Sequence, residues 1–323
     1  MKNTTLLTEA WTRLTEAVSL VLACHQNPDG DALGSALALA HVLRARGKDV
    51  SVVCEGGVPE SYKFIPEHET VVASTERRGF DVGMLVDCEG IKRAGSSKEA
   101  ILSGRIKACI DHHVPDDEFG EIRLVDPQAS STAELMVRLF EANGVEIDSV
   151  AANQLMAGLV NDTGGFRFGN TTPSTLRTAA RLVELGADVA SIAREIYESR
   201  TVRATKLLGR ALNSLETDPG GQAVWATITR GDLDELEATD ADTDSIVNQV
   251  GCVRGPKVAL LFRETKSENI RVSLRSRDGV DVNRVARVFG GGGHAAAAGC
   301  TLNLPLDEAK KAVIAEVLKW TAS

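Results

Sequence analysis

The sequence predicts an α/β protein in which a doubly wound, mostly parallel sheet is followed by a smaller α+β domain. With 323 residues the chain exceeds an ordinary single domain, so two domains are expected. Only 4% of the residues are aromatic, whereas Ala, Val and Leu are plentiful, which favours helices packed on a buried parallel sheet over an all-β sandwich. Apolar runs of strand length alternate with helical patterns through the first half, as βαβ units require.

The elements of the first half follow from short local patterns. The apolar run SLVLAC at 19–24 predicts a buried strand. Further strands are expected at 49–54, 81–86 and 106–110. Helices are expected at 32–46, 130–143 and 149–160. Gly47 and Gly144 stand just past the first two helices, as capping glycines do, and Ser130 or Ser131 supplies an N-cap for the second.

The second half begins with a segment, 173–215, whose mixed charges and regular apolar set predict continuous helix. The clearest boundary signal follows at TDPGG (217–221), because Pro and Gly interrupt regular structure. Beyond it, strands are expected at 223–229, 257–262 and 270–274, and helices near 282–289 and 306–320. We therefore expect a first domain at 1–185, a helical linker at 186–218 and a second domain at 219–323.

The overall charge limits the possible partners. A formal net charge of −9 argues against binding of long duplex nucleic acid, which needs a broad basic stripe. A small anionic substrate needs only local positive charge, which bound metal ions can supply. The six scattered cysteines, without zinc-ribbon spacing, indicate a reduced, cytoplasmic compartment. The N-terminus lacks the features of a signal peptide and no apolar run reaches about 18 residues, so no membrane partner is expected.

Imidazoles and carboxylates follow the ends of three predicted strands. HQNPDGD follows the first strand, Asp87 the third and the tripeptide DHH the fourth. Ligands bind at the carboxyl ends of strands in open parallel sheets, so these groups should meet at one edge. A further carboxylate, Asp162, follows an apolar helix, and negative charge near a helix C-terminus is disfavoured unless a cation is near. The residues expected at this edge are His25, Asp29, Asp31, Asp87, Asp111, His112, His113 and Asp162.

Each motif alone has a plainer interpretation. DGD is commonly a solvated turn, in which Pro28 and Gly30 would let Asp29 and Asp31 project from an irregular loop. Asp87 after its strand could be a helix N-cap. Adjacent histidines at the end of an apolar strand have no comparable structural role. Two other histidines, at positions 41 and 68, lie in a helix and a loop and receive no function.

The combined pattern predicts a two-metal site. Carboxylates this close together would repel one another unless cations lay between them. Ligation by oxygen and imidazole, without thiolate, suits Mn²⁺ as the first choice, with Mg²⁺, Fe²⁺, Co²⁺ or Zn²⁺ as alternatives. Five or six ligands exceed what one catalytic metal with open positions uses, so two divalent ions about 3.5–4 Å apart are expected.

A second cluster, four glycines at 290–293 followed by His294 and four alanines, lies in the C-terminal half. Consecutive glycines let backbone N–H groups approach a phosphate, and the alanines predict a helix whose N-terminus would face that anion. The plainer interpretation is a flexible turn before an Ala-rich helix. Alternation in VSLRSR puts Arg275 and Arg277 on one strand face, either as a phosphate clamp or as a solvated face.

Assembled in order, these motifs resemble the DHH/DHHA1 phosphoesterase superfamily over essentially the whole chain. HQNPDGDALGS is similar to its first motif, LVD ending at Asp87 to the second, Asp111-His112-His113 to the third and NDTGGF around Asp162 to the fourth. GGGGHAAAAG is similar to the signature of the DHHA1 domain. Within the superfamily the likeness is strongest to the nanoRNase (oligoribonuclease) and pAp phosphatase group, which includes relatives acting on linear or cyclic dinucleotides.

The resemblance implies two metal positions that share one carboxylate, that of Asp87. One is held by His25, Asp29 and Asp87, and the other by Asp31, Asp87, His112 and Asp162. It further implies that a metal-activated hydroxide attacks phosphorus. His113 would contact the scissile phosphate or protonate the leaving group, and Asp111 would orient a histidine.

The resemblance also implies the substrates and their second contact surface. Short oligoribonucleotides (nanoRNA and dinucleotides such as pApA), 3′-phosphoadenosine 5′-phosphate, or both are expected. The DHHA1 domain would bind the far part of the substrate, with the active site in the cleft between the domains. Its expected substrate contacts are Arg275, Gly292, Gly293 and His294. A homodimer is common among such proteins.

Four rivals remain at this stage. A manganese inorganic pyrophosphatase shares the first-domain motifs, but its SRKKQ-like motif is missing and GGGGH stands instead. A RecJ-type long-strand exonuclease usually carries additional DNA-binding domains. A cyclic-dinucleotide phosphodiesterase has the same motifs. A catalytically inactive nucleotide-binding regulator would be marked by loss of a metal ligand, and all six expected ligands are present.

Overall fold

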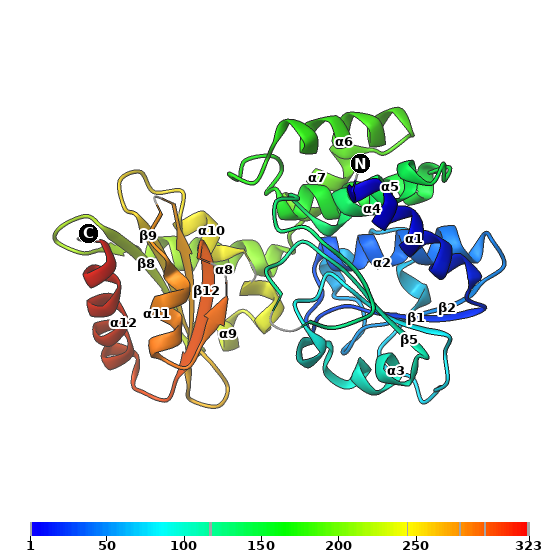
Figure 1. The fold of residues 1–323 in the computed structure, drawn as a ribbon. Coiled ribbons are helices and arrows are strands. Elements are labelled where there is room, and N and C mark those ends of the chain that lie inside the picture. The colour runs from blue at the N-terminus through cyan, green and yellow to red at the C-terminus, as the bar shows by residue number, and fades with distance from the viewer. Residues whose placement is uncertain (1, 116–117, 244, 278, 294, 322–323) are drawn as a thin grey trace. The chain divides into compact units, whose positions relative to one another are not determined.

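The structure, a computed structural model, describes residues 2–115, 118–243, 245–277, 279–293 and 295–321. The chain divides into two compact units, Met1–Ser199 (unit 1) and Arg200–Ser323 (unit 2). Each unit contains a six-stranded sheet with helices on both faces (Figure 1). The predicted combination of a parallel α/β unit and a smaller α+β unit is therefore confirmed. The division at Ser199 falls inside the segment predicted as a linker.

The sheet of unit 1 is entirely parallel and has the strand order β3-β2-β1-β4-β5-β6. Its strands are β1 (Ser19–Ala23), β2 (Asp49–Val53), β3 (Val71–Val72), β4 (Val82–Val86), β5 (Ile106–Asp111) and β6 (Ile122–Val125). The four predicted strands are the central ones, whereas the short edge strands β3 and β6 were missed. The strand order reverses between β1 and β4, which is the switch point where doubly wound sheets bind their ligands.

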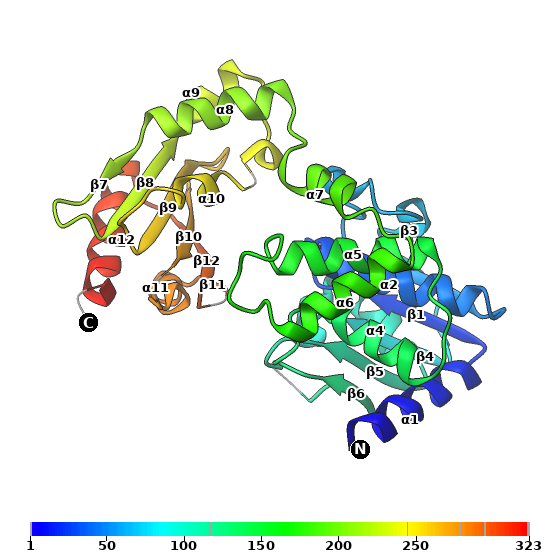
Figure 2. The same ribbon diagram turned by 90° about the horizontal axis from the view of Figure 1, so that it is seen from above.

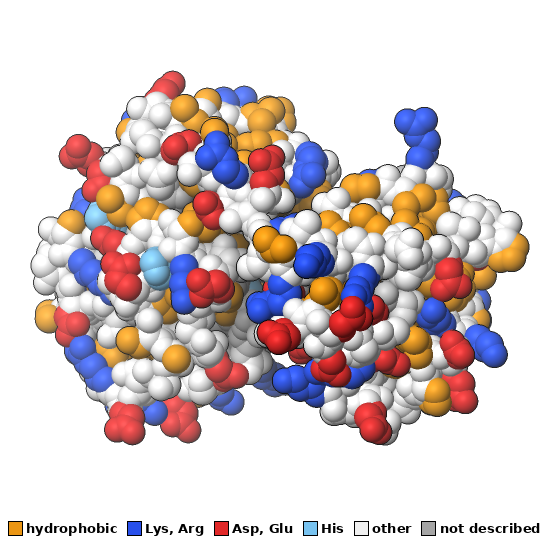
Figure 3. Space-filling model, turned by 180° about the vertical axis from the view of Figure 1, so that it is seen from behind, with side chains coloured by type: hydrophobic (Ala, Val, Ile, Leu, Met, Phe, Trp, Pro, Cys, Tyr) orange, Lys and Arg blue, Asp and Glu red, His pale blue; other side chains and the backbone are white. Residues whose placement is uncertain are grey.

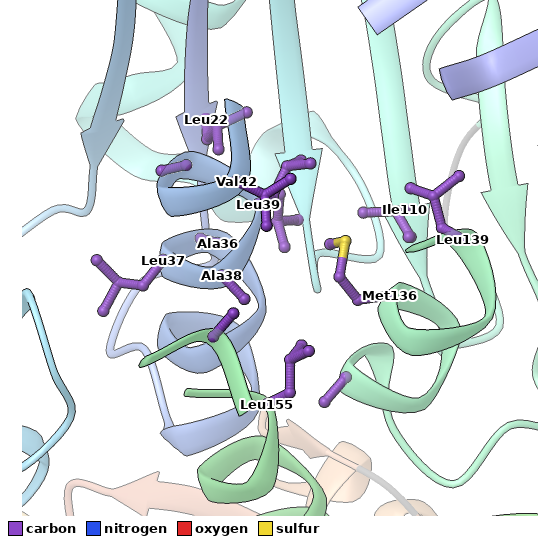
Figure 4. Close-up of a cluster of buried hydrophobic side chains, with 14 of the residues drawn as sticks. Leu22, Ala36, Leu37, Ala38, Leu39, Val42, Ile110, Met136, Leu139 and Leu155 are labelled. Atoms are coloured by element: carbon purple, nitrogen blue, oxygen red, sulfur yellow. The ribbon is translucent and has the colours of Figure 1, made fainter. Parts of the chain in front are cut away.

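Helices cover both faces of this sheet. One face carries α1 (Lys2–Glu16), α2 (Gly30–Arg44), α4 (Thr132–Ala142) and α5 (Ser149–Asp162). The other face carries η3 (Ile91–Ser97) and α3 (Lys98–Ser103). Figure 4 shows the first of these cores, in which Leu22 of β1, Leu39 of α2, Met136 of α4 and Leu155 of α5 are fully buried. Two short turns, η1 (Glu60–Tyr62) and η2 (His68–Thr70), lie between β2 and β3.

The expected continuous helix at 173–215 is wrong, because three separate helices occupy this segment. They are α6 (Pro173–Glu184), α7 (Val189–Tyr197) and α8 (Val202–Asn213). Gly186 has a φ of 97°, which ends the first helix. The side chains of Asp188 and Thr201 then accept backbone N–H groups and start the next two helices.

The sheet of unit 2 is mixed and has the order β11-β12-β10-β9-β8-β7, with β8 and β9 parallel and the other neighbours antiparallel. Its strands are β7 (Glu216–Thr217), β8 (Ala223–Ile228), β9 (Val258–Glu264), β10 (Ile270–Ser276), β11 (Gly292–Gly293) and β12 (Ala297–Leu302). One face packs against α11 (Val282–Val288) and α12 (Leu306–Thr321), and the other against α8, α9 (Arg230–Glu235) and α10 (Ile246–Val250), with η4 (Asp240–Thr243) preceding α10 (Figure 2).

The predicted helix over the alanines after the glycine run is also wrong. Ala297 and Ala298 begin strand β12, which pairs antiparallel with β10 and buries alternate residues. A Cβ on Gly291 would lie 2.2 Å from the Gly299 carbonyl oxygen, so this glycine allows a close approach to β12. Sheet pairing therefore outweighs the helix propensity of alanine here. His294 lies outside the described residues.

The surface of unit 1 on the face drawn in Figure 3 intersperses acidic and basic side chains. That pattern differs from the broad basic stripe that duplex binding needs. Within the described ranges, the helices are all too short or too polar to cross a membrane.

Candidate metal centre

The predicted polar groups lie at the carboxyl edge of the unit 1 sheet. His25 follows β1, and Asp87 follows β4 directly. Asp111 is the last residue of β5, and His112 and His113 come next. Because β1, β4 and β5 are neighbours in the sheet, the chain topology brings these side chains to the switch point.

The HQNPDGD motif forms the start of helix α2. Asp29 is the N-cap, and its Oδ1 accepts the backbone N–H groups of Asp31 (3.0 Å) and Ala32 (3.1 Å). Asp31 lies in the first helical turn. The expectation of an irregular loop at these positions is therefore wrong, since both carboxylates belong to a helix N-terminus, where negative charge is stabilised.

Asp31 is fully buried and is held by a second helix N-terminus. Its Oδ2 accepts the N–H of Thr132 (2.6 Å) and its Oδ1 accepts that of Ala133 (2.9 Å), both in the first turn of α4. Ser131 is the N-cap of this helix, as one of the two predicted alternatives. The backbone N–H groups of α4 thus replace the water molecules that burial keeps away from this carboxylate.

Asp87 is the central carboxylate of the cluster. It has a φ of 55°, and its Oδ1 accepts a hydrogen bond from Thr132 Oγ1 at 2.8 Å. The same oxygen lies 3.6 Å from His112 Nε2 and 3.6 Å from His113 Nδ1. Its Oδ2 lies 3.8 Å from His25 Nε2. Asp87 therefore faces groups from both sides of the switch point.

Asp162 and His112 form a close pair between α5 and the end of β5. Asp162 is the last residue of α5, and its Oδ2 lies 3.0 Å from His112 Nε2. Asn161 Nδ2 donates to Asp162 Oδ1 (3.1 Å), and Tyr62 donates to Asn161 Oδ1 (3.1 Å). This short relay fixes the carboxylate that sits at the unfavourable end of a helix dipole.

Asp111 orients the second histidine of the DHH tripeptide. Its Oδ1 accepts the backbone N–H of His113 at 3.1 Å and lies 2.7 Å from His113 Nδ1. Burial and the neighbouring His112 lower the pKa of His113, but the bond to Asp111 outweighs them and leaves that pKa above its ordinary value. With Nδ1 engaged by a carboxylate, Nε2 of His113 is the nitrogen directed to other partners.

The electrostatics of the cluster demand a counterion. Burial raises the pKa of Asp29, Asp31 and Asp87, and neighbouring carboxylates raise each of them further. Burial lowers the pKa of His112, but Asp162, Asp87 and Asp31 together raise it to about 11. The chain alone therefore concentrates negative charge here, and a bound cation would offset it.

The geometry of the donor atoms fits divalent metals. Among the described residues, three groups each have candidate ligand atoms that lie within 4.8 Å of one another. They are His25, Asp29 and Asp87; Asp31, His112 and Asp162; and Asp87, His112 and His113. Within the described part of the chain, buried His112 Nε2 has no hydrogen-bond partner although Asp162 is 3.0 Å away, because the two are not aligned for one. An imidazole nitrogen and carboxylate oxygens that point to a common position are better placed to bind a metal ion than to form hydrogen bonds with one another.

The predicted substrate contacts Arg275, Gly292 and Gly293 lie in unit 2, whereas the cluster is built from residues of unit 1. Arg275 Nε donates to Asn248 Oδ1 (2.9 Å) and its Nη1 to the Leu274 carbonyl (3.0 Å). Its pKa is lowered by burial, and it forms no ion pair with any residue that the structure describes. Gly292 and Gly293 are exposed in β11, and His294 is outside the described residues.

Three residues that position the cluster were missed by sequence reasoning. Thr132 binds both Asp31 and Asp87, while Asn161 and Tyr62 hold Asp162. The adjacency of Asn161 to Asp162 was a usable signal, and so was the SST run that starts α4. Tyr62 comes from a turn far away in sequence and had no local signal.

Comparison with known proteins identifies relatives along the whole chain. Residues 19–159 match the DHH family, N-terminal domain, and residues 220–323 match the DHHA1 domain. The chain is 34% identical over 301 residues to the bifunctional oligoribonuclease and PAP phosphatase NrnA of Thermus thermophilus, covering 92% of this chain and 89% of the relative. It is 29% identical to a probable enzyme of the same description from Streptococcus mutans, covering 87% and 88%. The crystal structure of an exopolyphosphatase-related protein from Bacteroides fragilis is similar with a TM-score of 0.93 and 25% identity, covering 98% of this chain and 97% of that one.

Proposed function

Because this chain belongs to the DHH family, we propose that it is a metal-dependent phosphoesterase that hydrolyses short oligoribonucleotides and 3′-phosphoadenosine 5′-phosphate. The observation that carries this proposal is the buried cluster of carboxylates and imidazoles at the switch point of the unit 1 sheet. The relatives described as oligoribonucleases and PAP phosphatases support the choice of substrate.

Two divalent ions, with Mn²⁺ as the first choice, would be held by the two ligand groups that share the neighbourhood of Asp87. The first group is His25, Asp29 and Asp87, and the second is Asp31, Asp87, His112 and Asp162. When bound, such ions would act as Lewis acids toward a phosphate oxygen and the attacking water. Oxygen and nitrogen ligands without thiolate support Mn²⁺ or Mg²⁺ over softer metals.

The protein's own groups supply orientation and a proton. Asp111 holds His113 Nδ1 at 2.7 Å, so a protonated His113 can donate from Nε2 toward a leaving oxygen. Thr132 and the N-terminus of α4 keep Asp87 and Asp31 in place. Arg275 in unit 2 has no carboxylate partner among the described residues, which supports a role in binding substrate phosphate. The glycine pair at 292–293 and His294 stay predicted substrate contacts.

The proposal is tested by measuring product release from a panel of substrates after the protein has been stripped with EDTA and reloaded with Mn²⁺ or Mg²⁺. The panel contains 3′-phosphoadenosine 5′-phosphate, the dinucleotide pApA, a 24-nucleotide RNA, cyclic di-AMP and inorganic pyrophosphate. We expect metal-dependent hydrolysis of the first two and little of the long RNA. Preferred cleavage of pyrophosphate or cyclic di-AMP would replace the proposed substrate, and no hydrolysis at all would favour the inactive nucleotide-binding regulator.

The matched variants are Asp87→Asn and Asp49→Asn. The first keeps the shape of the side chain but removes the central carboxylate, and a loss of several kcal/mol of transition-state stabilisation predicts about a thousandfold lower kcat. The second removes a half-exposed carboxylate at the start of β2 and should leave activity unchanged. Calorimetric titration should give two Mn²⁺ per wild-type chain. The homodimer and the reduced compartment stay predictions.

A further inference from the structure

The loop that follows Asp162 carries an exposed aromatic ring beside the metal centre. It runs from Thr163 to Asn170, and Asn170 Nδ2 donates to the carbonyl oxygens of Asp162 (3.1 Å) and Ser130 (3.0 Å). Both ends of the loop are therefore fastened at the metal centre. Within it, the side chain of Phe168 is 56% exposed, which is unusual for a large ring on an anchored loop.

The backbone of this loop is held in one conformation. Gly164, Gly165 and Phe166 have successive φ values of 61°, 67° and 65°. Thr163 organises the turn, because its carbonyl accepts the N–H groups of Arg167 (2.9 Å) and Phe168 (3.0 Å) and its Oγ1 accepts that of Phe166 (3.0 Å). A left-handed non-glycine residue costs on the order of 1 kcal/mol and persists where surrounding bonds enforce it. The exposed ring is thus presented on a rigid support.

The position of the ring is set by Gly164. A Cβ on this glycine would lie 2.5 Å from Phe168 Cε1 and Cζ, so the ring rests against the glycine backbone. Gly164 is two residues from Asp162, and two residues span at most about 7 Å. The ring therefore lies within the reach of a single nucleotide from the metal centre.

The residue before Phe168 in this loop is a cation, Arg167. The guanidinium of Arg167 donates to the Gly164 carbonyl and lies over the Tyr197 ring at 4.8 Å from its centroid. It forms no ion pair with any residue of the described ranges. Tyr197 in turn is anchored by a hydrogen bond from its hydroxyl to the Val160 carbonyl (2.7 Å). A guanidinium that is held in place and has no carboxylate partner binds phosphate well, since little of its freedom is lost on binding.

We propose that Phe168 and Arg167 form a nucleotide-binding subsite in unit 1, in which Phe168 stacks on a nucleobase and Arg167 contacts a phosphate of the same nucleotide. An exposed ring and a guanidinium without a carboxylate partner, both on one anchored loop, match the apolar and the anionic half of a nucleotide. Aromatic stacking tolerates every base, so the subsite binds nucleotides without selecting sequence. The inference rests on the proposed function for its occupant, a nucleotide of the substrate or its product.

The test compares the binding of AMP and of ribose 5-phosphate, which lacks the base, by calorimetry on the Mn²⁺-loaded protein. We expect the wild type to bind AMP more tightly than ribose 5-phosphate. Phe168→Ala should weaken AMP binding about tenfold, equivalent to about 1.4 kcal/mol, and leave ribose 5-phosphate unchanged. Phe168→Trp should restore AMP binding, and Arg167→Gln should weaken both ligands.

Leu102→Ala is the matched control. The substitution removes an exposed apolar side chain (44% exposed) from the end of α3, which directly precedes β5 and so lies at the amino ends of the strands, away from the metal centre. This variant should bind both ligands as the wild type does. Equal AMP binding by Phe168→Ala and wild type, or no preference of the wild type for AMP, would overturn the subsite. If Phe168→Ala loses the preference for AMP but the wild type hydrolyses no nucleotide, the subsite is supported and the proposed function is refuted.

Discussion

The hydroxyl of Thr132 offers a direct measure of how the fold positions the metal centre. It donates to Asp87 Oδ1 at 2.8 Å, and both side chains are buried. A hydrogen bond to a charged group contributes about 1.5–3 kcal/mol. Thr132→Val keeps the side-chain shape and the backbone bond to Asp31 but removes that donor. We expect Mn²⁺ affinity to fall about 10- to 100-fold, the range typical when a partner of a metal ligand is removed.

The assay titrates EDTA-stripped protein with Mn²⁺ and measures the free ion by electron paramagnetic resonance, so the measured affinity does not depend on turnover. Thr132→Ser keeps the donor and should bind Mn²⁺ nearly as the wild type does. Thermal unfolding of the stripped variants reports separately on stability, which should fall because Asp87 loses a buried partner. Wild-type Mn²⁺ affinity in Thr132→Val would refute the reasoning that this hydroxyl orients a ligand.

Two further predictions concern stability. Gly34→Ala should lower the free energy of urea unfolding of unit 1 by about 1–3 kcal/mol, because the new Cβ would lie 2.2 Å from a carbonyl oxygen of helix α5. In the control Gly209→Ala in α8 the new Cβ meets nothing within 4 Å, so that variant should be neutral or stabilising. Equal effects of the two substitutions would contradict the packing argument. Burial lowers the pKa of His41, but bonds to Asp148 (2.8 Å) and Glu67 (2.7 Å) leave it above its ordinary value. These two bonds should add about 1 kcal/mol to the free energy of unfolding below about pH 6.5, and this contribution should disappear as pH rises through the raised pKa of His41. Urea unfolding as a function of pH measures it, and His41→Gln should abolish the dependence.

The central strands of unit 1 could be predicted because they are buried on both faces and therefore appear as continuous apolar runs. Strands β3 and β6 lie at the sheet edges, are short and are partly exposed, so their sequences carry no such signal. The error at β12 has a different cause. Alanine and glycine tolerate close packing between strands, and the pairing partner β10 that decides the outcome lies more than twenty residues away.

The chemistry of the candidate site was visible in the sequence for a topological reason. His25, Asp87 and the DHH tripeptide each follow a strand, and the parallel arrangement brings all strand ends to one edge. The groups that hold them were harder to foresee. Thr132 acts through a helix N-terminus that only tertiary packing brings to Asp31, and Tyr62 acts across 99 residues of sequence. Ligand type follows from residue identity, whereas ligand support follows from the packing of helices.

The stripped protein should remain folded, because most of the cluster is satisfied without a metal. Asp31 accepts two amides of α4, Asp29 caps α2, and Asp87 accepts the Thr132 hydroxyl. Metal binding adds stability by linkage, about 2.7 kcal/mol for each bound ion at a concentration of one hundred times its Kd. For a unit of this size each ion corresponds to a Tm increase of roughly 5–11 °C, so the two proposed ions together predict roughly 11–22 °C. Far-UV circular dichroism should therefore show the same helical signal with EDTA and with Mn²⁺, and calorimetric scans should give a higher Tm with the metal. Loss of helical signal in EDTA would mean that these hydrogen bonds alone do not stabilise the buried carboxylates, and that the fold of unit 1 depends on the bound ions.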